Sequence, residues 1–179
     1  LAELAVKTGV SLQKGQDLVL TSPIEALPLV RKVVEHAYKA GANLVTPLFS
    51  DPEITVSRFE YASDQSFDKA TNWLYNGMAE AFDNNTARLA IVGEDPLLLS
   101  SQDPNKVSRA NKATSIAAKP AMERITRFDI NWNLISWPGK AWASQMFPEL
   151  DQESAQRKLA DAIFTASRVN SPDPISEWE

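Results

Sequence analysis

The sequence predicts an α/β fold: a three-layer, mostly parallel sheet of four or slightly more strands, Rossmann-like or flavodoxin-like, with helices on both faces. Short apolar segments alternate along the chain with longer segments of helical periodicity. The apolar segments are nearly continuous, which is typical of parallel strands buried on both faces. With 179 residues, 44% of them hydrophobic, the chain is long enough to bury one compact core.

Proline and glycine set the limits of the elements in the first quarter of the chain. Gly9 and Gly41 are each a natural stop for a preceding helix. Pro28 fits only in the first turn of a helix, so the regular part of that helix starts late. Pro47 removes a donor from its strand and indicates an edge position. The expected elements are helix 1–8, strand 17–22, a helix from 23 to about 40, and strand 43–49.

The middle of the chain predicts two helices and a third strand. Ser50 and Glu53 have the spacing of a capping box, in which each side chain bonds the backbone of the other residue. Phe67 opens the apolar stripe of the second helix, and Asn84-Asn85 is a turn signal. The expected elements are helix 50–62, helix 66–82 and strand 86–92.

The last part of the chain predicts a fourth strand between helices. Asp103-Pro104 begins a long polar helix, which Pro120 is expected to kink or break. In the fourth strand side chains alternate, so Trp132 and Ile135 are expected on opposite faces. The expected strand is 130–137, followed by helices 140–147 and 152–169.

Composition excludes several function classes. The net charge of −5 argues against general affinity for nucleic acid or an anionic membrane surface. No apolar run approaches the roughly 20 residues of a membrane span, and the start does not read as a signal peptide. The chain has no cysteine and one histidine, His36, so thiolate and histidine-rich metal sites are excluded. His36 lies within a predicted helix, and we expect it to be an exposed or half-packed residue and not a catalytic base.

Acidic side chains follow three of the strands, at the sheet edge where ligands bind in such folds. Glu25, Asp51, Glu53, Glu94 and Asp95 could form a divalent-ion site of oxygen ligands or act as helix caps, and we favour caps. No glycine-rich turn follows the first strand, which argues against dinucleotide binding. One run of basic residues indicates a solvated helix face better than an RNA-binding face: Lys106, Arg109, Lys112, Lys119, Arg124 and Arg127.

Large aromatic residues concentrate near the fourth strand and beyond it. They predict either core packing or the wall of an interface or substrate cavity. The group consists of Trp132, Trp137, Trp142, Phe147 and Trp178.

Four segments, in this order, resemble the thermophilic-type metallo-aminopeptidases, a family that includes aminopeptidases T and S and PepS. They are LAELAVKTGVSLQKGQDLVL, SPIEALPLVRKVVEHAYKAGA, VGEDPLLL and INW…SWPGKAWASQMFPEL. The resemblance implies a cytoplasmic, homodimeric exopeptidase that removes amino-terminal residues from peptides with two divalent metal ions of the zinc, cobalt or manganese class. It also implies that the metal ligands lie in a carboxyl-terminal half, so we expect no metal ligand and no catalytic residue on this chain.

The resemblance also suggests domain limits and a role. Residues 1–171 are expected to form an amino-terminal α/β domain, and 172–179 to begin the connection to a catalytic domain. Both ends of the chain look cut, because a helical pattern is under way at one end and a new helix starts at the other. The loops after the third and fourth strands are expected to line the substrate cavity, through Glu94, Asp95, Pro138 and Trp142. Two alternatives are a stand-alone binding or regulatory module with an acidic site, and a dimerisation domain.

Overall fold

The computed structural model describes residues 1–178, and these contain a single four-stranded parallel sheet. Its order is β2-β1-β3-β4, which places β2 and β4 at the edges, and it confirms the predicted α/β class and the edge position of the strand with Pro47. The order is flavodoxin-like and reverses between β1 and β3. The strands are β1 (Leu18–Pro23), β2 (Val45–Ser50), β3 (Ala87–Val92) and β4 (Trp132–Ser136).

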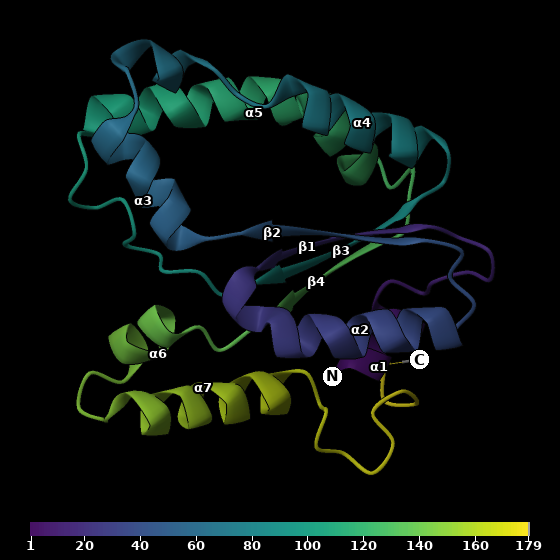
Figure 1. Ribbon diagram of the computed structural model, residues 1–179. Coiled ribbons are helices and arrows are strands. Elements are labelled where there is room, and N and C mark those ends of the chain that lie inside the picture. The colour runs from purple at the N-terminus through teal and green to yellow at the C-terminus, as the bar shows by residue number, and fades with distance from the viewer. Residues whose placement is uncertain (179) are drawn as a thin grey trace.

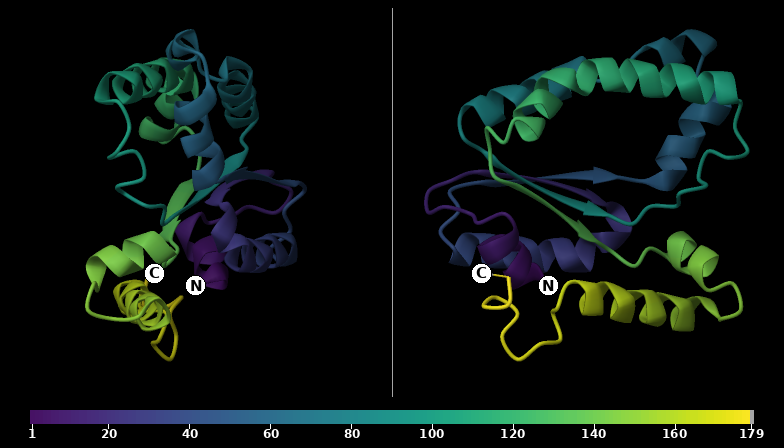
Figure 2. Two further views of the ribbon diagram at one scale, coloured as in Figure 1. Left: turned by 60° about the vertical axis from the view of Figure 1, so that its left-hand side comes forward. Right: turned by 180° about the vertical axis from the view of Figure 1, so that it is seen from behind.

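Helices cover both faces of the sheet, as Figures 1 and 2 show. Helices α4 and α5 lie over one face, and α1 and α2 lie against the other, with the α6–α7 pair beyond them (Figure 1). The helical elements are α1 (Ala2–Leu4), η1 (Ala5–Gly9), η2 (Ile24–Ala26), α2 (Leu27–Lys39), α3 (Pro52–Tyr61), η3 (Asp64–Asp68), α4 (Asn72–Asp83), α5 (Pro104–Thr126), α6 (Lys140–Met146) and α7 (Gln152–Ala166).

Strand alternation divides the interior into two cores. Leu18, Leu20 and Leu89 face α1 and α2 and are fully buried. Val19 and Trp132 lie on the other face, where they pack with side chains of α4 and α5. Trp132 and Ile135 therefore lie on opposite faces, as predicted, because each is in a different cluster. The α6–α7 pair has a small core of its own, formed by Ala143, Ala155, Leu159 and Ile163.

The predicted capping box at the start of α3 is wrong. Asp51 is the N-cap residue, and its Oδ1 accepts hydrogen bonds from the amides of Glu53 (2.8 Å) and Ile54 (3.1 Å). The Ser50 hydroxyl points elsewhere and donates to Glu94. Aspartate caps as well as serine does, so the local sequence offered two adjacent candidates.

The predicted helix 66–82 begins later than expected, at Asn72. Phe67 lies in the separate 3-10 turn η3, is fully buried, and packs against Phe59 with a ring-centroid distance of 5.1 Å. Its burial is thus against α3 and α5, not within the apolar stripe of α4. A short apolar run looks the same in both arrangements, because each requires only that Phe67 is covered.

Pro120 does not break α5, which runs from Pro104 to Thr126. Asp103 caps its start as predicted, accepting a hydrogen bond from the Asn105 amide at 2.8 Å. Proline removes one helical hydrogen bond, and the next residue, Ala121, is buried in the core between α5 and the sheet. Figure 2 shows the long helix continuing over the sheet.

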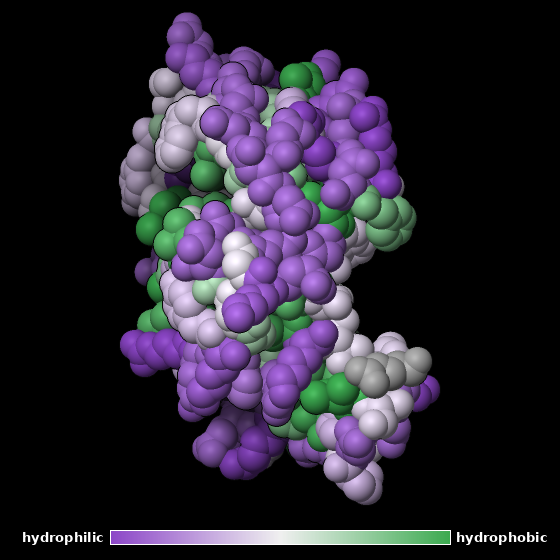
Figure 3. All heavy atoms as spheres, turned by 90° about the vertical axis from the view of Figure 1, so that its right-hand side faces the viewer, coloured by the Kyte–Doolittle hydropathy of each residue, from purple (hydrophilic) through white to green (hydrophobic). Residues whose placement is uncertain are grey.

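The surface is mostly polar on the side that shows the amino ends of the strands, with separate hydrophobic areas between the hydrophilic residues (Figure 3). Within residues 1–178, none of the helices combines the length and the apolar character that crossing a membrane requires. The expected connection 172–179 is described as far as Trp178, whose indole donates to the Ser167 carbonyl at 3.0 Å. The last residue of that expected connection, Glu179, lies outside the described residues.

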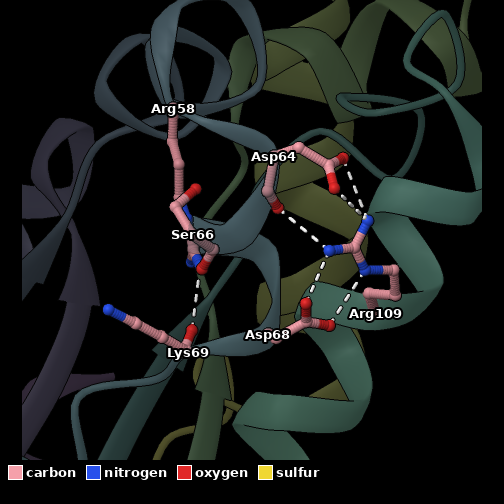
Figure 4. A network of polar contacts seen from close by, with 6 residues as sticks. All are labelled: Arg58, Asp64, Ser66, Asp68, Lys69 and Arg109. Atoms are coloured by element: carbon pink, nitrogen blue, oxygen red, sulfur yellow. Dashed lines mark hydrogen bonds and ion pairs between the residues drawn. The ribbon is translucent and has the colours of Figure 1, made fainter.

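The run of basic residues on and after α5 is partly neutralised by acidic neighbours. Arg109 binds both Asp64 (2.9 Å) and Asp68 (2.6 Å) and so connects α5 to η3 (Figure 4). Arg124 pairs with Asp83 at 2.6 Å. These pairs agree with a solvated helix face, because two of the cations already have carboxylate partners.

Arg109→Met is expected to weaken the dependence of folding stability on pH in the acid range. The Arg109 guanidinium donates hydrogen bonds to Asp68 and lowers the pKa of that carboxyl. The pair therefore stabilises the fold above the unfolded-state pKa, about 4, and this stabilisation is lost as pH falls through the lower folded-state pKa. The variant should melt about 1–3 °C below wild type at pH 7, and the difference should shrink below about pH 4.

Melting curves recorded by circular dichroism between pH 7 and pH 2 check this expectation. Arg31→Met, on the exposed side of α2, is the matched control and should melt like wild type throughout. A melting difference for Arg109→Met that stays constant down to pH 2 would contradict the ion-pair explanation.

Candidate functional site

The end of β2 and the loop after β3 meet at the carboxyl edge of the sheet. The Ser50 hydroxyl, at the end of β2, donates to Glu94 Oε1 at 3.2 Å. The amide of Gly93 approaches Glu94 Oε2 at 3.4 Å, which holds the carboxylate over its own loop. Glu94 thus connects the ends of two strands that lie on either side of β1.

Gly93 and Gly139 allow the loops after β3 and β4 to touch. Gly139 lies so close to the Gly93 carbonyl that a Cβ there would overlap it, and the same Cβ would lie 2.6 Å from a carboxylate oxygen of Glu25. The Trp137 amide donates to the Val92 carbonyl at 2.7 Å and continues the ladder beyond the strands. The sheet edge is therefore a closely packed surface formed by three loops.

Asp95 braces this surface and does not cap a helix. Its Oδ1 accepts hydrogen bonds from the Leu97 amide (2.8 Å) and from Gln145 Nε2 of α6 (2.6 Å). The sequence favoured a cap because Asp-Pro is a common helix start. The structure instead has a series of turns after Asp95, and the carboxylate links the β3 loop to α6.

The four residues predicted to line a substrate cavity lie near the same edge but do not line one pocket. Glu94 lines a cavity of about 390 Å³ between the sheet and α4–α5. Pro138 lines another, of about 550 Å³, which α1, α2 and α7 share with the loop after β4. Trp142 is partly buried against the core of α6 and α7. Their role toward a substrate remains a prediction.

The described residues do not fit a metal centre. Within residues 1–178, no group of three or more His, Cys, Asp or Glu side chains gathers closely enough to hold an ion. His36 lies on α2 and lines the second cavity together with Glu3, and these two side chains are fewer than the three that a metal-binding group requires. No chemical step is therefore assigned to a metal on these residues.

Sequence reasoning missed Arg88. This arginine interrupts the apolar run of β3, and its side chain lines the cavity between the sheet and α4–α5. The available signal was a charged residue at an inward-facing position of a central strand, where cations are rarely placed without a partner.

Comparison with known proteins confirms the family resemblance. The family model described as thermophilic metalloprotease (M29) matches residues 1–179. Aminopeptidase T of Thermus thermophilus is 46% identical over 179 residues, covering 100% of this chain and 44% of that protein. Aminopeptidase 2 of Geobacillus stearothermophilus is 38% identical over 177 residues, covering 99% of this chain and 43% of that protein.

A solved structure supports the same assignment. The structure titled wild-type AmpT from Thermus thermophilus superposes with a TM-score of 0.90 at 46% identity, covering 93% of this chain and 42% of that one. The chain thus spans less than half the length of the relatives it matches. Because the family model covers the whole sequence and the fold agrees, the chain belongs to the thermophilic metalloprotease family M29.

Proposed function

We propose that this chain is the amino-terminal α/β domain of a metal-dependent aminopeptidase that removes amino-terminal residues from peptides. The match of all 179 residues to the M29 family carries the proposal, together with relatives that are named aminopeptidases. The relatives are more than twice as long as the region they share with this chain. The remaining length is enough for a further domain.

We also propose which part of the enzyme holds the metal ions and which part this domain forms. Residues 1–171 form the domain and 172–179 begin the connection to the catalytic part. Two divalent ions of the zinc, cobalt or manganese class would be held outside these residues. Such a pair can polarise a carbonyl and activate water. The whole protein is proposed to be cytoplasmic and homodimeric, as the family resemblance implies.

Within that enzyme, this domain is proposed to shape access of peptides to the catalytic part. Its candidate surface is the carboxyl edge of the sheet, where open α/β sheets bind their ligands. The hydrogen bond between Asp95 and Gln145 and the contact of Gly93 with Gly139 hold this surface in one arrangement. A fixed edge supports such a role because precise substrate placement requires rigid walls.

Asp95→Ala and Trp142→Phe in the full-length enzyme are expected to change the preference for peptide length. Asp95→Ala frees α6 from the β3 loop, and Trp142→Phe trims the wall that α6 forms. The ratio of kcat/KM for a dipeptide to that for a pentapeptide should change about 3–10-fold. Steady-state kinetics across peptides of increasing length measures this ratio.

Two exposed positions provide matched controls. Trp73→Phe and Asp161→Ala alter residues of the same types on α4 and α7, and both should leave the ratio unchanged. An unchanged ratio in both test variants would remove Asp95 and Trp142 from the substrate path. An absence of any aminopeptidase activity in the metal-loaded full-length protein would instead overturn the proposed function itself.

A further inference from the structure

Arg88 is an inward-facing cation in the middle layer of the fold. It follows Ala87 and precedes Leu89, both fully buried on the face covered by α1 and α2. Side chains alternate along a strand, so Arg88 points to the opposite face, beneath α4 and α5 (Figure 1). In the parallel register it lies beside Val19 on one strand and Trp132 on the other.

One donor of Arg88 and one of its neighbour Trp132 have no partner in the described part of the chain. Arg88 Nε and the indole Nε1 of Trp132 are both buried and without a hydrogen-bond partner. Burial lowers the pKa of the Arg88 guanidinium, and no neighbouring charge contributes to that shift. Arginine nevertheless stays protonated in proteins. The Arg88 guanidinium forms no ion pair within the described residues, although the Glu94 side chain lines the same cavity.

Arg88 is half-buried, its Nε is buried without a hydrogen-bond partner, and an anion beside the guanidinium would compensate that desolvation. A buried cation is normally stabilised by an anion with hydrogen-bond acceptors. Guanidinium groups bind carboxylates with two parallel hydrogen bonds, which are among the strongest in proteins. The features around Arg88 therefore favour a ligand with one carboxylate group.

The cavity at Arg88 is apolar along most of its length. Its volume of about 390 Å³ is within the range of small-molecule sites. The wall is formed mainly by aliphatic and thioether side chains, with a few hydroxyls and the carboxylate of Glu94: Leu48, Leu74, Tyr75, Met78, Met122 and Leu134. Methionine side chains adapt readily to ligands of different shape. Such a wall suits a short hydrocarbon body and would not compensate a second charge.

We propose that this cavity binds a small monocarboxylate with an apolar body, its carboxylate on the Arg88 guanidinium and its body against Met78 and Met122. The ligand is either a free carboxylic acid or the carboxyl end of a short apolar peptide, since the two share this chemistry. The site lies within the domain and does not depend on the proposed peptidase function.

Calorimetric titration of the protein with hexanoate tests the site, with hexanamide as the uncharged probe of the same shape. Leucyl-leucine and its carboxyl-terminal amide form the peptide arm. Hexanoate or leucyl-leucine should bind at least about tenfold more tightly than its own amide. Tighter binding of hexanoate would identify a free carboxylic acid as the ligand, and tighter binding of leucyl-leucine would identify the carboxyl end of a peptide. Equal affinity of acid and amide in both arms, or no binding of either acid up to about 10 mM, would overturn the proposal.

Substitution locates the binding. Arg88→Met keeps the length of the side chain and removes its charge, and it should weaken the acid at least about tenfold. Arg31→Met on the exposed side of α2 should have no effect. Unchanged affinity in Arg88→Met would overturn the assignment. If that variant does not fold, the Nε–H signal of Arg88 in the wild-type NMR spectrum decides, since it must shift on addition of the acid and not of the amide.

Discussion

Gly93→Ala is expected to destabilise the protein by about 3 kcal/mol. Gly93 has a φ of +153°, a conformation that residues with a Cβ rarely adopt. A Cβ at this position would overlap the carbonyl oxygen of Trp137 and lie 3.2 Å from the Trp137 Cβ. Backbone atoms cannot rotate away as a flexible side chain would, so the β4 loop must shift. Urea denaturation followed by circular dichroism measures the change.

Substitutions at two other glycines separate the effect of backbone strain from that of steric overlap in Gly93→Ala. Gly15 has a φ of +81°, and nothing lies within 4 Å of the position that a Cβ would take there. Gly15→Ala therefore tests conformational strain alone and should cost about 1 kcal/mol. Gly77 lies within α4 with open space around it, so Gly77→Ala should stabilise by about 0.5–1 kcal/mol. A loss for Gly93→Ala no larger than that for Gly15→Ala would contradict the close packing of the two loops.

Phe67→Ala is expected to cost about 3–5 kcal/mol, because it removes a fully buried aromatic side chain. Phe67 fills the small core beneath α3 and α5, where its ring packs on Phe59. Arg58 and Lys106 also lie over the ring, at 5.7 Å and 5.4 Å from its centroid, and would lose that contact. Chemical denaturation gives the total loss of stability.

Hydrogen exchange shows where the effect of Phe67→Ala is concentrated. This core is separate from the two cores against the sheet, so protection should fall first in α3 and η3. Tyr61→Ala is the control, because Tyr61 is 83% exposed and its loss should change stability by less than about 0.5 kcal/mol. A similarly small effect of Phe67→Ala would mean that this core contributes little to stability.

The strands could be predicted closely from the sequence. All four occur within two residues of the predicted limits. The central strands β1 and β3 are buried, nearly continuous apolar runs, whereas the edge strand β2 is mostly exposed and was identified by its apolar sequence alone. Asp103 was also correctly identified as a cap, since capping depends on only a few neighbouring residues. The start of α4 could not be predicted in the same way, because Phe67 is buried by contacts with α3 and α5.

The candidate site was less predictable than the fold. The sequence indicated that Glu94 and Asp95 follow a strand, but their partners, Ser50 and Gln145, are 44 and 50 residues away along the chain. It shows Arg88 as a charged residue within an apolar strand, but not that the Arg88 Nε lacks a hydrogen-bond partner. Pairing over such separations depends on how elements pack, which local spacing does not record.

By itself the sequence determined the fold class, the number and position of the strands, and the family to which the chain belongs. These follow from the order and spacing of apolar and polar residues, which can be read directly from the sequence. Only the tertiary structure decided the order β2-β1-β3-β4, the contact of Gly93 with Gly139, and the position of Arg88 beneath α4 and α5. The reason is physical: strand order and side-chain partners are set by long-range packing, in which many segments compete for the same faces.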